Sequence, residues 1–354
     1  MLYKYLKILI VVFVVSATQN LIAQIPEGYY STTDGLTGEA LKTALYNIIK
    51  NHVEFPYTSS GTDVWDILKE TDKDTVNPEN VILLYTGWTM DAALEYNNEN
   101  GWSREHVWAK SHGDFGTEKG AGTDVHAIRP SDITVNSARS NHDFSAGGNI
   151  YIDADGTTGC RRTSNSWEPR DVVKGDVARM IFYMATRYEG EGEEPDLEIV
   201  DYVNSSQNKE PIHGKFSDLY EWHLKDTVSS WEQNRNDIIY YQYQGNRNPF
   251  IDHPEFVEKI WGNFVFANKI EDIYQINVYP NPFNNYINVE LGCKDVNSNK
   301  IKIQLFDVYG KLLRNIKSDS SLVSIPCSDL STGIYIMKFI FIDNSVKRKI
   351  LFKN

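Results

Sequence analysis

The chain has 354 residues, with 35 lysines and arginines against 48 aspartates and glutamates, so its formal net charge at pH 7 is −13. The hydrophobic fraction of 41%, with 12% aromatic residues, is that of a chain that buries a core, which excludes a disordered or collagen-like protein. The acidity excludes a basic nucleic-acid-binding protein, because an acidic surface repels phosphates over roughly 8–10 Å at moderate salt.

The N-terminus predicts a secretory signal peptide over residues 1–23. Residues 1–7 carry two lysines and no acid, residues 8–17 are apolar, and Ala23 marks the expected cleavage point. The apolar run is shorter than the ~20 residues that a membrane span needs. Release is therefore favoured over anchoring, and no stable membrane span is expected.

Helices are predicted where apolar residues recur at helical spacing. The predicted helical segments are residues 36–52, 63–70, 171–188, 215–226, 229–244 and 254–262. A short apolar run at residues 81–85 predicts a strand. Residues 97–159 are polar and rich in glycine and asparagine with few periodic signals, which is typical of functional loops.

The pattern changes to short strands at about residue 273. The predicted strands are residues 276–280, 286–291, 300–306, 311–316, 321–325, 333–339 and 347–352. Strands of this length and spacing predict a small, immunoglobulin-like (Ig-like) β-sandwich. We therefore expect an α+β fold, with a mixed helical domain over residues 24–269 and an all-β domain over residues 270–354.

The polar stretch holds a cluster of titratable side chains. Its members are Glu105, His106, His112, Asp124, His126, Arg129, Arg139 and His142, with Asn136 among them. Clustered titratable groups on loops are a signal of a functional site, although a single histidine there is more often a surface or hydrogen-bonded residue. The spacing matches no zinc pattern such as HExxH.

The motifs of this stretch carry a resemblance to a known family. GWSREHVWAKSHGDFG, followed by TDVHAIRPSDITVNSARSNHDF, resembles the endonuclease I family of His-Me finger (ββα-metal) nucleases, especially its extracellular bacterial branch. The resemblance covers about residues 29–262, with several motifs in the family's order. It implies a ββα-metal finger within the mixed helical domain, which would then be a nuclease domain.

The resemblance also implies roles for individual residues. His106 would be the general base, and Glu105 and Asn136 would be metal ligands. A neutral imidazole suits a base at neutral pH, and oxygen ligands suit Mg²⁺, with Ca²⁺ or Mn²⁺ as alternatives. Arg139 matches an arginine of the family and is the second catalytic candidate: it would clamp a phosphate or, equally well, form an ion pair or cap a helix.

Phosphodiester cleavage supports this assignment on physical grounds. The reaction needs an activated nucleophile, neutralised non-bridging oxygens and a stabilised leaving 3′-oxygen, which one base and one divalent cation can supply. Neighbouring residues on a strand point to opposite faces, so Glu105 and His106 can both serve only if the metal lies at one edge of the strand. A following helix must then bring Asn136 back.

Other residues receive weaker predictions. His126 is expected to order the finger by hydrogen bonding rather than perform chemistry. Asp176 and Arg179, three residues apart on a predicted helix, are expected to hold the fold together. Glu168 also matches a family position. Some relatives place a basic phosphate-stabilising residue between the two motifs, and Lys119 is only a positional candidate for it.

The C-terminal segment carries a second resemblance. VYPNPFNNYINV, LFDVYGKLL, LSTGIYIMKF and KRKILFKN together resemble the sorting domain used by type IX secretion in certain Gram-negative bacteria. This implies the type IX machinery as a partner and a protein that is secreted, extracellular or attached to the cell surface. A generic carbohydrate- or protein-binding sandwich is the alternative. Whether Cys293 and Cys327 pair is left open.

These patterns favour a secreted, monomeric, metal-dependent and largely sequence-nonspecific endonuclease that cuts DNA, RNA or both and leaves 5′-phosphates. The alternatives are a catalytically inactive surface-binding protein and a small-nucleotide phosphodiesterase. Residues 24–269 carry 22 basic against 40 acidic side chains. Phosphate must therefore be engaged through the bound cation and a local cluster, for which Arg104, Arg129 and Arg139 are the candidates.

Overall fold

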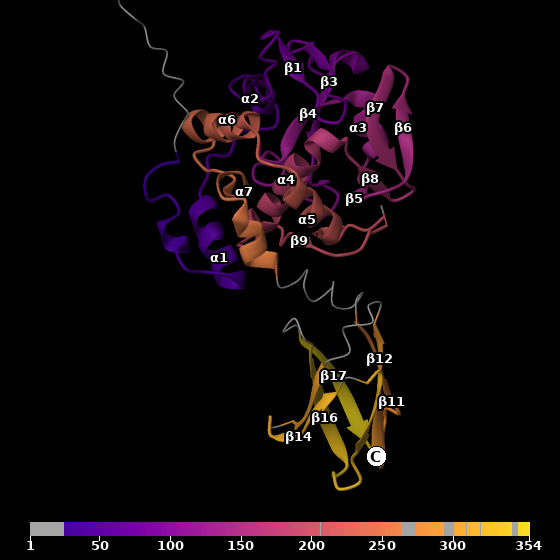
Figure 1. Cartoon of the computed structure of the whole chain (residues 1–354). Coiled ribbons are helices and arrows are strands. Elements are labelled where there is room, and N and C mark those ends of the chain that lie inside the picture. Colours follow the sequence, from indigo (N-terminus) through magenta and orange to yellow (C-terminus); the bar gives the residue numbers. More distant parts are fainter. Residues whose placement is uncertain are drawn as a thin grey trace, which may run out of the picture.

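The computed structural model describes residues 25–205, 207–262, 274–293, 301–308, 310–318, 320–341 and 346–354. The expected signal peptide lies outside these residues. Helices and short strands are mixed up to residue 262, and only strands follow from residue 274 (Figure 1). The expected α+β content is confirmed. Within the described residues, no helix combines the length and the apolar character needed to cross a membrane.

The elements up to residue 262 are short. The helices are α1 (Gly38–Ile49), α2 (Val64–Thr71), α3 (Ile133–Arg139), α4 (Lys174–Arg187), α5 (Phe216–Lys225), α6 (Ser230–Ile238) and α7 (Pro249–Asp252), and residues 255–262 are also helical. The strands are β1 (Asn80–Ile82), β2 (Thr89–Asp91), β3 (Trp102–His106), β4 (Ile128–Asp132), β5 (Asp143–Phe144), β6 (Asn149–Asp153), β7 (Gly156–Arg162), β8 (Ser166–Glu168), β9 (Glu198–Ile199) and β10 (Ile212–His213).

Helix α4 is the centre of the larger hydrophobic core. Every residue from Gly175 to Arg187 is buried, as expected for a helix surrounded by protein. Helices α1, α5 and α7 pack against it (Figure 1). Arg179 of α4 pairs with Asp226 at 2.5 Å, with Glu232 at 2.6 Å and with Asp176 at 3.5 Å. The structural ion pair expected between Asp176 and Arg179 is thus confirmed.

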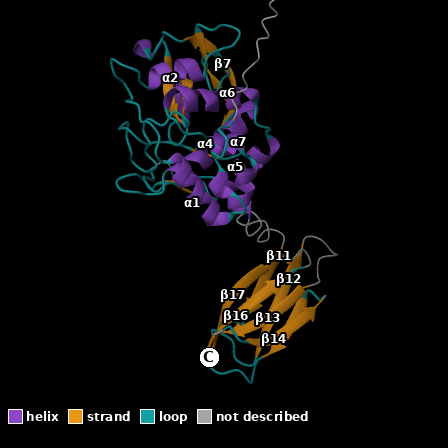
Figure 2. Ribbon diagram, turned by 90° about the vertical axis from the view of Figure 1, so that its left-hand side faces the viewer, coloured by secondary structure: helices purple, strands orange, loops and turns teal. Residues whose placement is uncertain are grey.

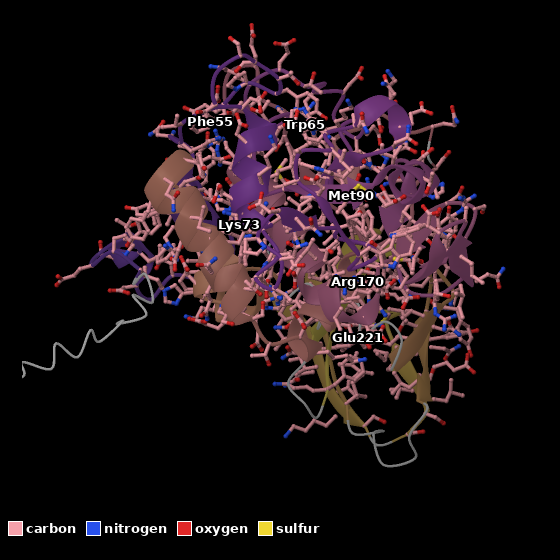
Figure 3. All side chains as sticks on the ribbon, turned by 90° about the horizontal axis from the view of Figure 1, so that it is seen from above. Phe55, Trp65, Lys73, Met90, Arg170 and Glu221 are labelled. Carbon is pink, nitrogen blue, oxygen red and sulfur yellow. The ribbon has the colours of Figure 1, made fainter. Side chains whose placement is uncertain are left out.

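A second, smaller core lies between α2 and the β3–β4 pair. The rings of Trp65 and Trp102 meet edge to face with centroids 4.6 Å apart. Phe55 and Met90, which Figure 3 labels beside Trp65, pack against the same cluster. This core supports β3 from one side, which matters for the site because the strand carries two of its predicted residues.

The polar stretch over residues 97–159 is more ordered than its sequence indicates. It contains β3, β4, α3, β5, β6 and β7, none of them longer than seven residues. Elements this short offer too few positions for a periodic pattern to emerge. The prediction of functional loops with little regular structure is therefore wrong for much of this stretch.

The seven strands predicted after residue 273 are confirmed. They are β11 (Tyr274–Tyr279), β12 (Tyr286–Cys293), β13 (Ile301–Asp307), β14 (Leu312–Ser318), β15 (Leu322–Pro326), β16 (Gly333–Ile340) and β17 (Val346–Lys353). They form antiparallel sheets of order β11-β12-β15 and β14-β13-β16-β17 (Figure 2). The buried side chains of the two sheets form one hydrophobic core. Cys327 is a buried free thiol, and the side chain of Cys293 lies outside the described residues.

Buried histidine makes the stability of the fold sensitive to acid. Burial, followed by the charge of Arg179, lowers the pKa of His223 on α5 to about 4. The unfolded chain, with a histidine pKa of about 6.5, takes up its proton first as the pH falls. The contribution of His223 to stability is therefore complete above pH ~6.5 and is lost progressively towards pH 4.

We expect His223→Gln to reduce the loss of unfolding free energy between pH 7 and pH 4.5 by roughly 2 kcal/mol. The glutamine amide can replace the imidazole N–H that donates to the carbonyl of Pro254 at 3.0 Å. Urea unfolding at both pH values measures the difference. The same pH dependence in wild type and variant would contradict the expectation.

Candidate active site

Strands β3 and β4 and helix α3 pack against one another and carry the predicted site residues. The two strands are antiparallel neighbours along their whole length. Helix α3 begins directly after β4, because the carboxylate of Asp132 caps it by accepting from the backbone N–H groups of Thr134 and Val135 at 2.9 and 3.0 Å. The chain turns back at once, which returns Asn136 to β3.

A cavity of about 330 Å³ opens where these elements meet. Its lining consists of Tyr57, Arg104, Glu105, His106, Ala109, Lys110, Ser111, Asn136, Arg139, Ser140 and Asn141. All four residues predicted for the site are among them: Glu105, His106, Asn136 and Arg139. The tertiary structure thus brings together residues that are up to 34 positions apart.

Glu105 has one carboxylate oxygen committed to the protein. Its Oε1 accepts from the hydroxyl of Tyr85 at 2.6 Å and pairs with Nη1 of Arg139 at 3.2 Å. Burial raises the pKa of this carboxyl, and Arg139 and Tyr85 oppose the rise. No residue of the described part donates to Oε2, so this oxygen remains for a ligand in the cavity.

A chain of hydrogen bonds orients the amide of Asn136. Its Nδ2 donates to Oγ of Ser103 at 2.9 Å, and Ser103 donates in turn to the carbonyl of Ser131 at 3.1 Å. Because the serine proton is used on the carbonyl, Ser103 must accept from the amide nitrogen, which leaves Oδ1 of Asn136 available. Oδ1 and Oε2 of Glu105 are hard oxygen donors of the kind that Mg²⁺ and Ca²⁺ prefer. The residues present therefore fit a divalent cation.

His106 has the tautomer that a general base needs. Its Nε2 lies 2.9 Å from the carbonyl oxygen of Gly122. A carbonyl can only accept, so Nε2 carries the proton and Nδ1 keeps its lone pair. Burial, together with the charges of Lys110 and Arg104, lowers the pKa of the imidazole to about 4, against the bond to Gly122. The ring is neutral at pH 7 and can take a proton from water.

Aromatic stacking holds the ring of His106 in place. The ring of Tyr57 lies 5.6 Å from it at an interplanar angle of 25°. The guanidinium of Arg104 lies 3.4 Å from the centroid of Tyr57 and 4.0 Å from that of Trp65. It also donates to the carbonyl of Tyr57 and, at 3.0 Å, to the hydroxyl of Thr58. Arg104 is thus committed to supporting the base.

Arg139 is in the cavity lining but is almost fully buried, with 1% of its surface exposed. Besides its ion pair with Glu105, it donates to the carbonyls of His106 at 3.1 Å and Val107 at 2.7 Å. It therefore ties the end of α3 to the end of β3, in agreement with the ion-pairing alternative. A direct contact between Arg139 and phosphate stays a prediction.

The phosphate-binding cluster expected from Arg104, Arg129 and Arg139 is wrong in its composition. Arg129 does not line the cavity: it is buried, pairs with Asp72 at 2.5 Å and lies over the ring of Trp231. The three guanidiniums are engaged by protein groups. Burial explains the error, because a sequence shows which arginines are near a motif but not which of them are available to a ligand in the folded protein.

Two further predictions concern residues near the cavity. His126 is buried, and its Nε2 donates to the carbonyl of Asn246 at 3.1 Å, which agrees with the expected ordering role. Lys119 is not among the cavity residues, whereas Lys110 is. The lysine in the cavity lining is therefore the one that follows His106 by four positions.

His112, Asp143 and His213 form a second group with metal-ligand chemistry. Their ligand atoms all lie within 4.8 Å of one another. His213 is already hydrogen-bonded, however, through Nδ1 to the carbonyl of Gly214 at 2.9 Å and through Nε2 to Arg139 at 3.4 Å. A cation bound through either nitrogen would have to displace one of these bonds. The oxygen pair on β3 and α3 is therefore the better cation site.

Sequence reasoning missed four residues that shape the site: Tyr57, Tyr85, Ser103 and Lys110. Ser103 could have been found, because it lies two positions before Glu105 on the same strand face. Lys110 lies in the quoted motif but looks like any exposed lysine. Tyr57 and Tyr85 come from distant segments and carry no local signal.

Comparison with known proteins decides the family. A sequence model of the family described as endonuclease I matches residues 37–255. The chain belongs to this family. A second model, described as the secretion system C-terminal sorting domain, matches residues 277–353. Both resemblances drawn from the motifs are thus confirmed.

Two curated relatives are similar over the nuclease part. The chain is 54% identical over 233 residues to a Bacillus subtilis (strain 168) protein named extracellular ribonuclease, covering 66% of this chain and 78% of the relative. It is 52% identical over 235 residues to a protein of the same name from Bacillus amyloliquefaciens, again covering 66% and 78%. This endonuclease I family member is accordingly a nuclease that acts on nucleic acids and is secreted or held at the cell surface.

We expect Arg139→Gln to lower the free energy of unfolding by roughly 3 kcal/mol, because Glu105 loses its buried partner. Urea unfolding of the two proteins measures the loss. Arg161→Gln is the matched control: Arg161 is exposed, and its replacement should change stability by less than about 0.5 kcal/mol. An Arg139→Gln protein as stable as wild type would contradict the structural role.

Proposed function

We propose that this nuclease is a metal-dependent, largely sequence-nonspecific endonuclease that hydrolyses phosphodiester bonds in RNA, DNA or both and leaves 5′-phosphates. One observation carries the proposal. A neutral imidazole with an available Nδ1 lines the same cavity as two uncommitted oxygen donors, those of Glu105 and Asn136. A base beside a cation site is what phosphodiester hydrolysis requires.

In this proposal His106 is the general base. Its Nδ1 takes the proton from the attacking water, while the bond from Nε2 to Gly122 and the ring of Tyr57 keep the imidazole in one orientation. The ring does not have to change tautomer before the reaction, because the carbonyl of Gly122 already holds the proton on Nε2.

Glu105 and Asn136 would hold one Mg²⁺, with Ca²⁺ or Mn²⁺ as alternatives. When bound, the cation supplies neutralisation of the non-bridging oxygens and stabilisation of the leaving 3′-oxygen. Arg139 would act as a positioning residue: by engaging Oε1 of Glu105 it directs the other oxygen to the cavity.

The finer description of the fold belongs to the same proposal. We assign β3, β4 and α3 to a ββα-metal finger and the C-terminal strands to an Ig-like sandwich. The proposed division is a signal peptide over residues 1–23, a nuclease domain over 24–269 and a type IX sorting domain over 270–354. We also propose that the protein works as a monomer.

The relatives named extracellular ribonuclease support RNA as a substrate of this chain. DNA is included because His106 and the cation ligands act on the phosphodiester, which both polymers share. A small-nucleotide phosphodiesterase is the alternative enzyme, and a catalytically inactive binder is the alternative without turnover. The following assay separates all three.

We expect wild type to digest plasmid DNA or long RNA with Mg²⁺ and to stop with chelator, and His106→Ala to be at least about 100-fold slower, because a positioned base contributes that much. Initial rates on both polymers and on a dinucleoside monophosphate give the comparison. His253→Ala, which alters a histidine outside the cavity, is the control. Normal cutting by His106→Ala, or cleavage of the dinucleoside alone, would contradict the proposal.

We expect Ser103→Ala to raise the Mg²⁺ concentration for half-maximal activity about tenfold, because the amide of Asn136 loses the group that orients it. Calorimetric titration of the resting protein with Mg²⁺ should show the same shift without turnover. Ser137→Ala, at an exposed neighbour of Asn136, should leave both values unchanged. A normal metal dependence in Ser103→Ala would remove this support for Asn136 as a ligand.

A further inference from the structure

The cavity of the proposed active site has three cationic side chains in its lining, Arg104, Lys110 and Arg139. Arg104 is committed to Tyr57, and Arg139 is committed to Glu105. Lys110 is exposed, and within the described part of the chain no ion pair or hydrogen bond engages its ammonium. It is therefore the cation at this cavity that remains available to a ligand.

The loop that carries Lys110 is anchored to the protein. The indole N–H of Trp108 donates to the carbonyl of His112 at 2.8 Å, and the backbone N–H of His112 donates to the carbonyl of Ala109 at 2.8 Å. The imidazole of His112 is buried, with 1% of the residue exposed. Lys110 thus projects from a fixed turn, which reduces the ordering cost of binding a ligand there.

A hydroxyl donor lies next to Lys110 on the same wall. Nδ2 of Asn141 donates to Oγ of Ser111 at 3.1 Å, which joins the loop after β3 to the loop after α3. Ser111 accepts in this bond, so its own O–H can donate to a ligand. Ser140, which also lines the cavity, has a φ of 55°. This backbone conformation is unfavourable for residues other than glycine and occurs often at binding sites.

The position of Lys110 relative to the base points to a neighbouring phosphate. Lys110 lines the same cavity as His106 and follows it by four positions, just after the end of β3. Yet Lys110 comes from the loop after β3, whereas the proposed cation ligands Glu105 and Asn136 come from β3 and α3. The scissile phosphate belongs with the cation, so the ammonium would meet the phosphate beside it.

We propose that Lys110 and Ser111 bind the non-bridging oxygens of a phosphate adjacent to the scissile one. This subsite rests on the proposed endonuclease function and deepens it, because it selects substrates with at least two phosphates over small nucleotides. It also supplies local positive charge where residues 24–269 carry 22 basic against 40 acidic side chains.

Binding is tested without turnover in the His106→Ala protein. Anisotropy of a labelled 12-nucleotide RNA is measured with Mg²⁺ over a range of salt concentrations. Adding Lys110→Gln should weaken binding roughly threefold to fivefold and reduce the slope of log affinity against log salt by about 0.7 to 1. Lys110→Arg should keep the affinity, and Lys119→Gln, an exposed lysine outside the cavity, should change neither value.

Kinetics of the single variants separate this contact from the chemistry. On polymer RNA, Lys110→Gln should lower kcat/KM by raising KM and should leave kcat nearly unchanged. The decrease in kcat/KM should be larger than on a dinucleoside monophosphate. Unchanged affinity and salt slope would overturn the subsite, as would a loss confined to kcat, which would put Lys110 at the scissile phosphate. A failure of the proposed function would give a different result: the His106→Ala protein would still cut RNA, with either lysine or glutamine at position 110.

Discussion

The buried guanidinium of Arg139 is the interaction on which the geometry of the site depends. It comes from the last turn of α3 and meets the carboxylate of Glu105 and the carbonyls of His106 and Val107 at the end of β3. A planar group with five donors suits this task, because it can serve a carboxylate and two carbonyls at once. Strand and helix are thereby held together next to the cavity.

Each functional side chain of the site has one polar atom bound by a protein group, which orients the side chain and leaves its second polar atom available. The carbonyl of Gly122 accepts from Nε2 of His106, and Oγ of Ser103 accepts from the amide of Asn136. Tyr85 and Arg139 engage one carboxylate oxygen of Glu105. The remaining atoms are Nδ1 of His106, Oδ1 of Asn136 and Oε2 of Glu105, whose side chains line one cavity. Preorganisation of this kind lowers the free energy needed to reorganise the site during the reaction, because folding has already placed the partners.

The acidity of the nuclease part and its action on polyanions are compatible because charge acts locally. Surface charges are screened beyond roughly 8–10 Å at moderate salt. A cation held by Glu105 and Asn136, together with the exposed ammonium of Lys110, would dominate the field that a phosphate meets in the cavity. Most arginines near the motif serve the interior instead, as Arg104 and Arg129 illustrate.

Local signals predicted α1, α2, α4, α5 and α6, the seven C-terminal strands and the grouping of Glu105, His106 and Asn136, because apolar periodicity and motif wording are properties of short segments. Apolar periodicity did not reveal β3, β4 and α3, since five to seven residues are too few for a period, and only the resemblance of the motifs implied strands and a helix there. Only the tertiary structure decided that Arg104 packs on aromatic rings, that Arg129 pairs with Asp72, and that Lys110 has no ion-pair partner among the described residues. The reason is physical. The sequence specifies which groups each side chain can bind, but the partner that it contacts in the folded protein depends on burial and on contacts between distant segments.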